Sequence, residues 1–338
     1  MLAPLSCIIG LSGKRLKKSE SVFLRDANPW GVILFARNVD APDQLRKLTG
    51  DIRDAMGRNT IIFVDQEGGR VQRLRAPHWR AFPSGDDYAS IFRRDREKGL
   101  RACYLGHRLI ADDLRAVGIT SNCAPVLDLP QPGADPIISD RALGNSVVDI
   151  VDMAHAAMAG LMEGGVAPVI KHIPGHGRAT VDSHKALPKI KANRQTLENS
   201  DFLPFRKLSD APMAMTAHAV YTHNSRSAVT ISRKSLTELI RAAIGYDGLL
   251  MTDDLDMKAL TGDLTRKAER ALKAGCDIAL QCSGHLSDSV KVAKGSTSLS
   301  GRAFERAMVA EGCAEHITAF DRDAAEEEFD EFFTKAMA

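Results

Sequence analysis

Short apolar runs recur along the chain, and longer polar stretches separate them. Eight of these runs have the length and composition of buried strands: Leu5–Ile9, Val32–Phe35, Ile61–Val64, Ile119–Val126, Ala167–Ile170, Met213–Thr216, Leu249–Thr252 and Asp277–Leu280. Four intervening stretches have apolar residues at helical spacing and few helix breakers: Gly99–Ala116, Asp149–Met162, Arg233–Ile244 and Leu264–Ala274. Alternating strands and helices predict a parallel sheet covered by helices.

Eight strand–helix units predict a (β/α)₈ TIM barrel, which typically takes about 250 residues before loop insertions. An open doubly wound sheet is the competing architecture, but neither G-x-G-x-x-G after the first strand nor a Walker loop is present. We therefore predict one barrel domain over residues 1–338. Phenylalanines interleaved with acidic residues predict that residues 313–338 form a C-terminal helical segment packed on the barrel.

Composition narrows the class of protein. Of the 338 residues, 44% are hydrophobic and 26% are charged, and 45 basic against 43 acidic residues give a formal charge of +2. This balance argues against nucleic-acid and membrane partners and favours a small-molecule substrate. Six cysteines without a C-x-x-C pair, an N-terminus without a basic leader and the lack of a spanning apolar run predict a cytoplasmic protein. We expect a monomer, because no sustained heptad pattern appears.

The densest polar segment follows the fifth predicted strand. Residues 171–184 read KHIPGHGRATVDSH and contain three histidines, an Asp and a Lys. In α/β enzymes the active site lies where parallel strands end and loops begin. Polar residues also follow five other predicted strands: Arg37 and Asn38, Asp65 and Glu67, Asp128, His218, and Asp253 and Asp254. In a barrel these ends converge on one face, so we expect one shared site.

Two of these loops suggest carbohydrate chemistry. In the segment 65–73, DQEGGRVQR, a carboxylate precedes two glycines that allow a sharp turn, and two arginines follow. Carboxylates and cationic donors together suit sugar hydroxyls. The segment 251–257, MTDDLDM, ends a strand in two adjacent carboxylates, either of which is a plausible nucleophile. The loop at Ser139–Gly144 adds Arg141, which by itself would be interpreted as part of a surface ion pair.

Asp182 and His184 lie two residues apart, so in an extended loop their side chains can point the same way. A carboxylate on one ring nitrogen fixes the tautomer and leaves the other nitrogen for proton transfer near neutral pH. The competing interpretation is an Asx-turn that carries an exposed histidine.

Together these motifs resemble glycoside hydrolase family 3, in its single-domain bacterial β-N-acetylhexosaminidase branch. The similarity runs from FARN at 35–38 through VDQEGGR at 64–70 and the K-H-x-P-G-H-G…D-S-H loop to TDDL at 252–255. It implies a retaining enzyme that cleaves β-1,4-linked N-acetylglucosamine from 1,6-anhydro-N-acetylmuramyl peptides during peptidoglycan recycling. No metal and no cofactor are implied.

The same resemblance implies the roles of individual residues. Asp253, directly after the small hydroxyl residue Thr252, would be the nucleophile, His184 the acid/base and Asp182 the group that orients and tunes it. The sugar would be bound by five residues: Asp65, Arg73, Arg141, Lys171 and His172. Most retaining glycosidases use two carboxylates about 5–5.5 Å apart, so a histidine acid/base departs from the usual pattern. Ile173 and Leu143 stand where the family usually has Phe.

Other functions remain open on the sequence. A metal-dependent amidohydrolase could gather His172, His176, His184 and Asp254 around Zn²⁺, but such barrels need His-x-His after the first strand, and residues 10–13 read GLSG. A β-glucosidase or a glycoside phosphorylase of the same family would share the predicted site. A sugar-binding protein without catalysis would bind saccharide but not turn it over.

Overall fold

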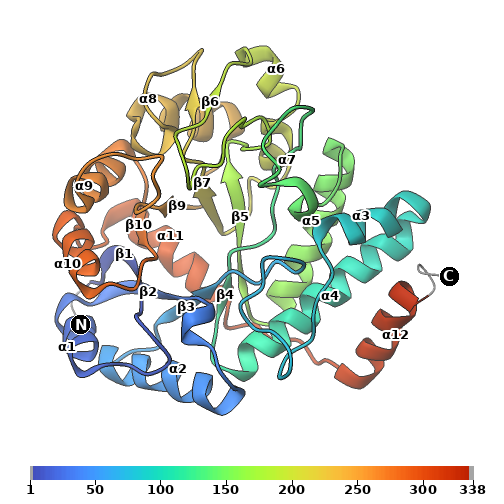
Figure 1. Cartoon of the computed structure of the whole chain (residues 1–338), viewed down its shortest axis with the longest axis horizontal. Helices are drawn as coiled ribbons and strands as arrows, with labels where there is room; N and C mark the ends of the chain where they lie inside the picture. Colours follow the sequence, from blue (N-terminus) through green and yellow to red (C-terminus); the bar gives the residue numbers. More distant parts are fainter. Residues whose placement is uncertain (1–2, 335–338) are drawn as a thin grey trace.

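Eight parallel strands close into a barrel, in the order β1-β10-β9-β7-β5-β4-β3-β2 (Figure 1). The computed structural model describes residues 3–334. The barrel strands are β1 (Leu5–Gly10), β2 (Pro29–Leu34), β3 (Ile61–Val64), β4 (Ser121–Asn122), β5 (Ala167–Ile173), β7 (Met213–Thr216), β9 (Leu249–Asp254) and β10 (Ile278–Gln281). Each predicted strand corresponds to one of them in the predicted chain order, which confirms the (β/α)₈ architecture.

The barrel interior is a packed core of large apolar side chains. Alternate residues of the strands point inward, among them Ile8, Trp30, Phe63, Val169 and Met251, and all five are fully buried. The helix α11 (Gly301–Gly312) adds Ala307 and Ala310 to the same core. Bulky inward side chains fill a barrel of this size, so they leave no channel through it. A ligand can therefore be held only at the ends of the strands or on the surface.

Helices surround the barrel and bury a second, larger apolar layer against the outward faces of the strands. They are α1 (Lys18–Ala27), α2 (Pro42–Met56), α3 (Gly85–Arg94), α4 (Arg96–Ala116), α5 (Val147–Glu163), α6 (Arg194–Glu198), α7 (Phe202–Lys207), α8 (Arg233–Ser235), η4 (Leu236–Ile244), α9 (Leu264–Ala274), α10 (Leu286–Gly295), α11 and α12 (Arg322–Thr334). Short 3₁₀ turns are η1 (Ala36–Asn38), η2 (Ser139–Arg141) and η3 (Val229–Ile231). The predicted helix over Leu264–Ala274 matches α9, and η4 is wound as a π-helix.

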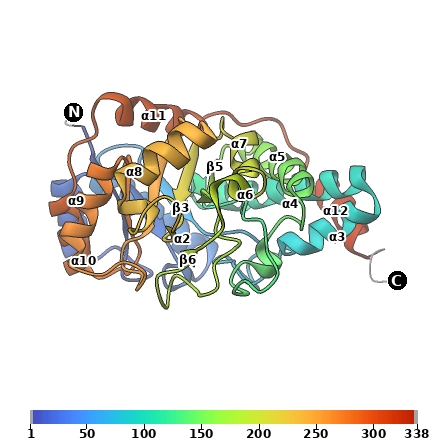
Figure 2. The same ribbon diagram turned by 90° about the horizontal axis from the view of Figure 1, so that it is seen from above.

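The two ends of the barrel differ. Figure 2 shows α11 on one side of the molecule and β6 on the opposite side. Strands β6 (Lys189–Ile190) and β8 (Val220–Tyr221) form a separate two-stranded sheet from the loops that follow β5 and β7. Because those loops leave the C-terminal ends of the strands, this small sheet supports the end of the barrel where the predicted site residues lie.

The C-terminal helix α12 packs beside α3 and α4, away from the strands (Figure 1). Phe329 is almost fully buried there and contacts the rings of Phe82, Tyr88 and Phe333. Arg101 of α4 also forms an ion pair with Glu328. The aromatic residues of this segment therefore face other helices. Residues 335–338 of the predicted segment lie outside the described residues.

Two strands differ from their predicted bounds. The run Ile119–Val126 forms only a two-residue strand, β4, because the Ala124 N–H donates back to Asn122 O at 2.8 Å and Pro125 has no N–H to donate to a ladder. Strand β5 instead extends three residues beyond the predicted end at Ile170. Lys171 and His172 therefore lie inside the strand, with a register shift against β7 at this point. Their placement is set by the sheet and not by a loop.

Among residues 3–334, no helix has both the length and the apolar character that crossing a membrane requires.

The helix α11 has three exposed hydrophobic side chains, those of Phe304, Met308 and Val309.

Candidate active site

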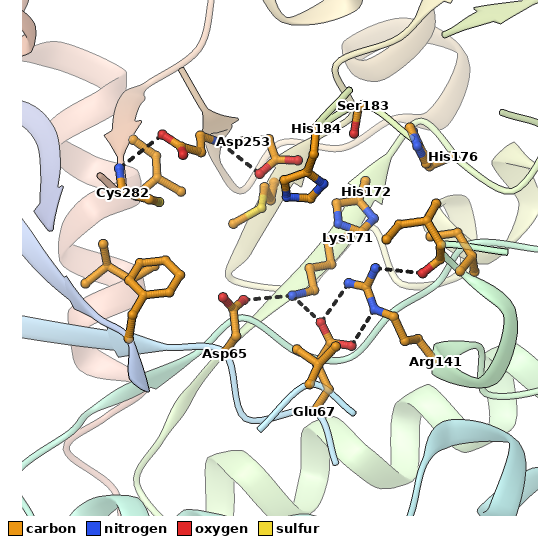
Figure 3. Close-up of a pocket in the computed structure, with 18 of the residues that line it drawn as sticks. Asp65, Glu67, Arg141, Lys171, His172, His176, Ser183, His184, Asp253 and Cys282 are labelled. Carbon is orange, nitrogen blue, oxygen red and sulfur yellow. Dashed lines mark hydrogen bonds and ion pairs between the residues drawn. The ribbon is translucent and has the colours of Figure 1, made fainter. Parts of the chain in front are cut away.

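A pocket opens among the C-terminal ends of the barrel strands (Figure 3). Side chains from seven strands or their following loops line it, including Phe35, Asp65, Lys171, Asp253 and Cys282. Its volume is about 190 Å³, below the range of about 300–1,000 Å³ typical of sites for drug-sized ligands. The pocket therefore suits a small polar ligand such as one sugar residue.

Charges alternate along one side of the pocket. Lys171 Nζ donates to Asp65 Oδ1 at 3.0 Å and lies 2.6 Å from Glu67 Oε1. Arg73 Nη2 donates to Asp65 Oδ2 at 3.0 Å, and Arg141 donates to both Glu67 oxygens at 2.8 Å. We call these five residues the charged chain. Three cations against two anions leave one positive charge, and every member is at least three-quarters buried.

The partners keep both carboxylates ionised. Burial opposes ionisation of Glu67, but Arg141 and Lys171 outweigh it and lower its pKa to about 2. The pKa of Asp65 is also below its ordinary value, because Lys171 and Arg73 overcome the cost of burial. In turn, Asp65 and Glu67 raise the pKa of Lys171 against the effect of its own burial. The charged chain therefore offers fixed donors and acceptors to sugar hydroxyls at neutral pH.

A tight turn after β3 puts both carboxylates on this side of the pocket. The Glu67 N–H donates to Val71 O at 2.9 Å, and Gly68 and Gly69 between them have positive φ angles of 102° and 53°. A Cβ on Gly68 would lie 2.0 Å from Pro83 O. Only glycine fits such a position. The predicted turn is confirmed.

Asp128 links two histidines at the pocket. Its Oδ2 lies 2.6 Å from His172 Nδ1, and its Oδ1 accepts the His176 backbone N–H at 2.6 Å. Asp128 is fully buried, which by itself would raise its pKa, but His172 and His176 hold the pKa below the ordinary value. The carboxylate therefore fixes the His172 ring so that its other nitrogen is free to contact a ligand.

The two adjacent carboxylates at the end of β9 have different environments. Within residues 3–334, the Asp253 carboxylate accepts a single hydrogen bond, from the Asp254 N–H at 2.8 Å. Asp254 Oδ1 accepts the N–H groups of Asp256 and Cys282, at 3.1 and 3.0 Å. Burial raises the pKa of Asp254 to about 6. Burial acts the same way on Asp253, but His218, His172 and the Asp254 N–H outweigh it, so its pKa is below the ordinary value.

His218 lies behind this pair, fully buried. Its Nε2 lies 3.0 Å from Asp254 O, and its Nδ1 lies 2.8 Å from Thr230 Oγ1. Because a carbonyl oxygen can only accept, Nε2 carries the proton, and burial lowers the pKa of the ring. His218 thus supports the end of β9 as a neutral donor and does not line the pocket.

The loop after β5 brings Asp182 and His184 to the rim of the pocket. His184 Nδ1 lies 2.8 Å from Asp182 Oδ1, and the same oxygen accepts the His184 backbone N–H at 2.8 Å. The two sequence interpretations are thus both realised, since an Asx-turn also positions the ring. Asp182 is buried, whereas 65% of the His184 side chain is exposed. Burial alone would raise the pKa of Asp182, but the His184 N–H and ring lower it below the ordinary value.

Contacts on both sides hold this loop in place. Arg178 Nε donates to the fully buried Asp201 at 2.8 Å, and the Asp135 N–H donates to Ala179 O at 2.7 Å. On the other side, the Ala259 N–H donates to Ser183 O at 3.2 Å. The histidine is thus exposed to the pocket and to solvent, but its backbone is tied to neighbouring loops.

All eight residues that the sequence proposed for the site gather here. Seven line the pocket, namely Asp65, Arg73, Arg141, Lys171, His172, His184 and Asp253, and Asp182 lies behind His184. Glu67 and Asp128 were expected on this face but were given no role, and His176 of the loop after β5 was given none either; the structure places Glu67 and His176 in the pocket lining and Asp128 behind His172. Glu67 and Asp128 stand at strand ends, so their position along the chain was a usable signal. The surface ion pair considered for Arg141 is made by its neighbour Asp140, with Arg70.

Three of the four residues considered as Zn²⁺ ligands have other partners. His172 bonds to Asp128, His184 bonds to Asp182, and the Asp254 carboxylate accepts two backbone N–H groups. Between residues 3 and 334 there is no cluster of three or more His, Cys, Asp or Glu side chains arranged to hold a metal ion. The arrangement instead combines an ionised carboxylate, an Asp-oriented imidazole and a polar cradle.

Known proteins are similar to this chain in sequence and in fold. Residues 5–308 match the glycosyl hydrolase family 3 N terminal domain. A protein named Beta-hexosaminidase from Alkalilimnicola ehrlichii is 39% identical over 286 residues, which are 83% of this chain and 81% of that protein. The Beta-hexosaminidase of Bordetella pertussis is 35% identical over 294 residues, 86% of this chain and 83% of its own.

Solved structures agree with this similarity. NagZ from Neisseria gonorrhoeae, in complex with N-trifluoroacetyl-D-glucosamine, superposes with a TM-score of 0.87 at 29% identity over 98% of both chains. A glycoside hydrolase family 3 β-N-acetylglucosaminidase from a Paenibacillus species gives a TM-score of 0.86 at 25% identity, covering 97% of this chain and 66% of that one.

Proposed function

This chain belongs to glycoside hydrolase family 3 as a β-N-acetylhexosaminidase, and we propose that it is a retaining exo-enzyme that forms a covalent glycosyl–Asp253 intermediate. Its proposed substrates are N-acetylglucosamine-β-1,4-anhydro-N-acetylmuramyl peptides, released in peptidoglycan recycling in the cytoplasm. The observation that carries the mechanism is the pairing of an ionised Asp253 with an Asp182-oriented His184 at one small pocket.

In the first step Asp253 attacks the anomeric carbon while His184 protonates the leaving oxygen. Asp253 suits the nucleophile because its carboxylate is held ionised and no cationic side chain bonds to it within residues 3–334. Figure 3 draws the Asp253 and His184 side chains next to each other, and both line the pocket. In the second step His184 removes a proton from water, which hydrolyses the glycosyl–Asp253 ester and restores both groups.

Asp182 supports the proton transfers. Since its carboxylate accepts from Nδ1, the His184 Nε2 is the nitrogen that gives and takes the catalytic proton. When His184 is protonated, the same carboxylate stabilises the imidazolium.

The position of the charged chain accounts for the removal of terminal sugar residues. The charged chain would bind the hydroxyls of the terminal sugar through Asp65, Arg73, Lys171 and Arg141, with His172 beside it. These groups close the pocket on the side away from His184, while the exposed rim beside His184 leaves room for the rest of the substrate. One terminal residue would therefore be removed at a time.

The test is hydrolysis of an aryl β-N-acetylglucosaminide beside the matching β-glucoside, followed by ¹H NMR of the first-formed sugar. We expect turnover of the N-acetyl substrate with the β-anomer formed first, unchanged by a chelator. Added inorganic phosphate should leave the rate and product unchanged, whereas a sugar phosphate would identify a phosphorylase. Formation of the α-anomer first would exclude a covalent intermediate. Release of N-acetylglucosamine from an anhydromuramyl peptide then tests the natural substrate class.

A further inference from the structure

His176 is a buried histidine at the pocket that the proposed mechanism does not use. Its residue surface is 4% exposed, it lines the pocket, and its Nε2 has no hydrogen-bond partner among residues 3–334. Its ring stands 5.8 Å from that of His172, centroid to centroid. Burial lowers the pKa of His176 to about 4, so the ring is neutral at physiological pH.

Contacts on both sides fix the backbone that carries this ring. The His176 N–H is bound by Asp128, and the Tyr221 hydroxyl donates to the preceding Gly175 O at 2.5 Å. On the following side, a Cβ on Gly177 would lie 1.9 Å from Leu129 O, so this segment packs directly against the neighbouring backbone. A buried polar atom without a partner is costly. Such an atom, on a fixed stretch of backbone and on a residue that lines a pocket, indicates that a ligand supplies the partner.

The surroundings of His176 are neutral and partly apolar. Ser183 is 6% exposed, lines the pocket, and its hydroxyl makes no hydrogen bond to another group among residues 3–334. Ile137 and the buried Ile138 line the pocket as well. Two neutral polar groups and an apolar wall fit an acetamido group, whose amide needs hydrogen bonds and whose methyl needs an apolar contact.

We propose that His176 and Ser183 bind the 2-acetamido group of the sugar and thereby select N-acetylhexosaminides over simple hexosides. This inference rests on the proposed function. In the proposed pose the anomeric carbon lies at Asp253 and the hydroxyls lie at the charged chain. Between the anomeric carbon and these hydroxyls, one edge of the sugar ring carries the C2 acetamido group. The opposite edge carries the ring oxygen.

The side chains on the two sides of the pocket differ, and this difference indicates which side each edge of the sugar ring faces. Figure 3 shows His172, His176 and Ser183 on one side of the Asp253 carboxylate and Cys282 on the other. Phe35, Leu280 and Cys282 line the pocket without a charged head group. The acetamido edge therefore faces the histidine side, where its amide finds hydrogen-bonding partners.

The test compares His176→Leu with wild type on 2,4-dinitrophenyl β-N-acetylglucosaminide and 2,4-dinitrophenyl β-glucoside, whose reactive leaving group makes slow turnover measurable. We expect kcat/KM for the N-acetyl substrate to fall about tenfold, the equivalent of one hydrogen bond left unmade, and that for the glucoside to fall less than twofold. The surface variant His155→Leu, on the exposed face of α5, is the control and should match wild type on both.

Further variants separate binding from structure. His176→Gln, which keeps an amide donor and acceptor, should recover part of the N-acetyl rate, and Ser183→Ala should lower that rate about threefold, again sparing the glucoside. If His176→Leu does not fold, these two variants decide by the same comparison. Equal losses on the two substrates, or no loss on either, would overturn the inference. A wild type without N-acetylglucosaminidase activity would instead overturn the proposed function.

Discussion

His184 Nδ1 lies 2.8 Å from Asp182 Oδ1, an oxygen that also accepts the His184 backbone N–H. One carboxylate oxygen thus fixes both the backbone turn and the ring of the proposed acid/base. The neighbouring loops hold this turn through Ser183 O and Arg178, while the ring itself stays largely exposed. Proton transfer can therefore be assigned to a group with a defined orientation, although it lies at the rim of the pocket.

His184→Ala should reduce activity according to the leaving group. Substrates with poor leaving groups need protonation, so their kcat/KM should fall by about 10²–10⁴-fold. Activated aryl glycosides, whose phenolate leaves without a proton, should lose far less at the bond-breaking step. The measurement is kcat/KM over a series of aryl N-acetylglucosaminides whose phenols range from strongly acidic to weakly acidic. A loss independent of the leaving group would remove His184 from the acid role.

Substitutions can distinguish the roles of the two carboxylates of β9, Asp253 and Asp254. Asp253→Ala should abolish turnover of every substrate, because the glycosyl–enzyme bond cannot form. Asp254→Asn keeps Oδ1 as an acceptor for Asp256 and Cys282, so it should retain most of the activity. Mass spectrometry of protein labelled with a slow-reacting activated fluorosugar should locate the sugar on Asp253. Label on Asp254 would reverse the assignment.

The stability of the protein should depend on Asp254 in a pH-dependent way. Its pKa rises from an ordinary 3.8 to about 6 in the folded state, mainly through burial. A raised carboxyl pKa means that folding favours the protonated form, so stability is lost as pH rises from about 4 to 6. The variant Asp254→Asn should therefore be more stable than wild type by about 1–3 kcal/mol at pH 8 and nearly equal to it at pH 4.

That prediction is checked by urea unfolding of both proteins at the two pH values. Asp256→Asn, at an exposed position in the same loop, is the control and should show little difference between pH 4 and pH 8. A stabilisation of Asp254→Asn that did not change with pH would mean that the carboxyl does not titrate in this range.

Lys171→Met should destabilise the fold, because it leaves Asp65 and Glu67 buried beside fewer cations. Removing one partner from a buried ion-pair network costs about 3–5 kcal/mol. Both carboxylates have lowered pKa values, so the stability they contribute is present above about pH 4 and is lost toward their folded values, about 2 for Glu67. The penalty of the variant should accordingly be largest at pH 7 and smaller near pH 4.

Chemical denaturation at pH 7 and pH 4 measures this effect, with the exposed Lys189→Met as the matched control. The double variant Lys171→Met/Glu67→Gln should be more stable than Lys171→Met alone, since it removes one of the stranded charges. If the double variant were less stable, the charged chain would contribute through packing and not through charge.

The sequence by itself determined the architecture and the end of the barrel where chemistry occurs. Apolar runs of strand length alternate with helical periodicity, and the polar residues begin where those runs end, so the positions of Asp65, Lys171 and Asp253 along the chain suffice to group them. The local turn after β3 was also predictable, because two consecutive glycines permit the backbone angles that it needs.

The tertiary structure decided the ionisation and the partners of the site residues, which the local sequence pattern does not determine. The different ionisation of Asp253 and Asp254 depends on burial, on His218 and on the N–H of Cys282, which come from other strands and loops. The pairing of Glu67 with Arg141 joins residues 74 positions apart. The lack of a hydrogen-bond partner for His176 Nε2 among residues 3–334 is visible only in the packed structure. Burial, charge pairing and hydrogen-bond satisfaction are sums over neighbours in space, so they follow from the fold and not from spacing along the chain.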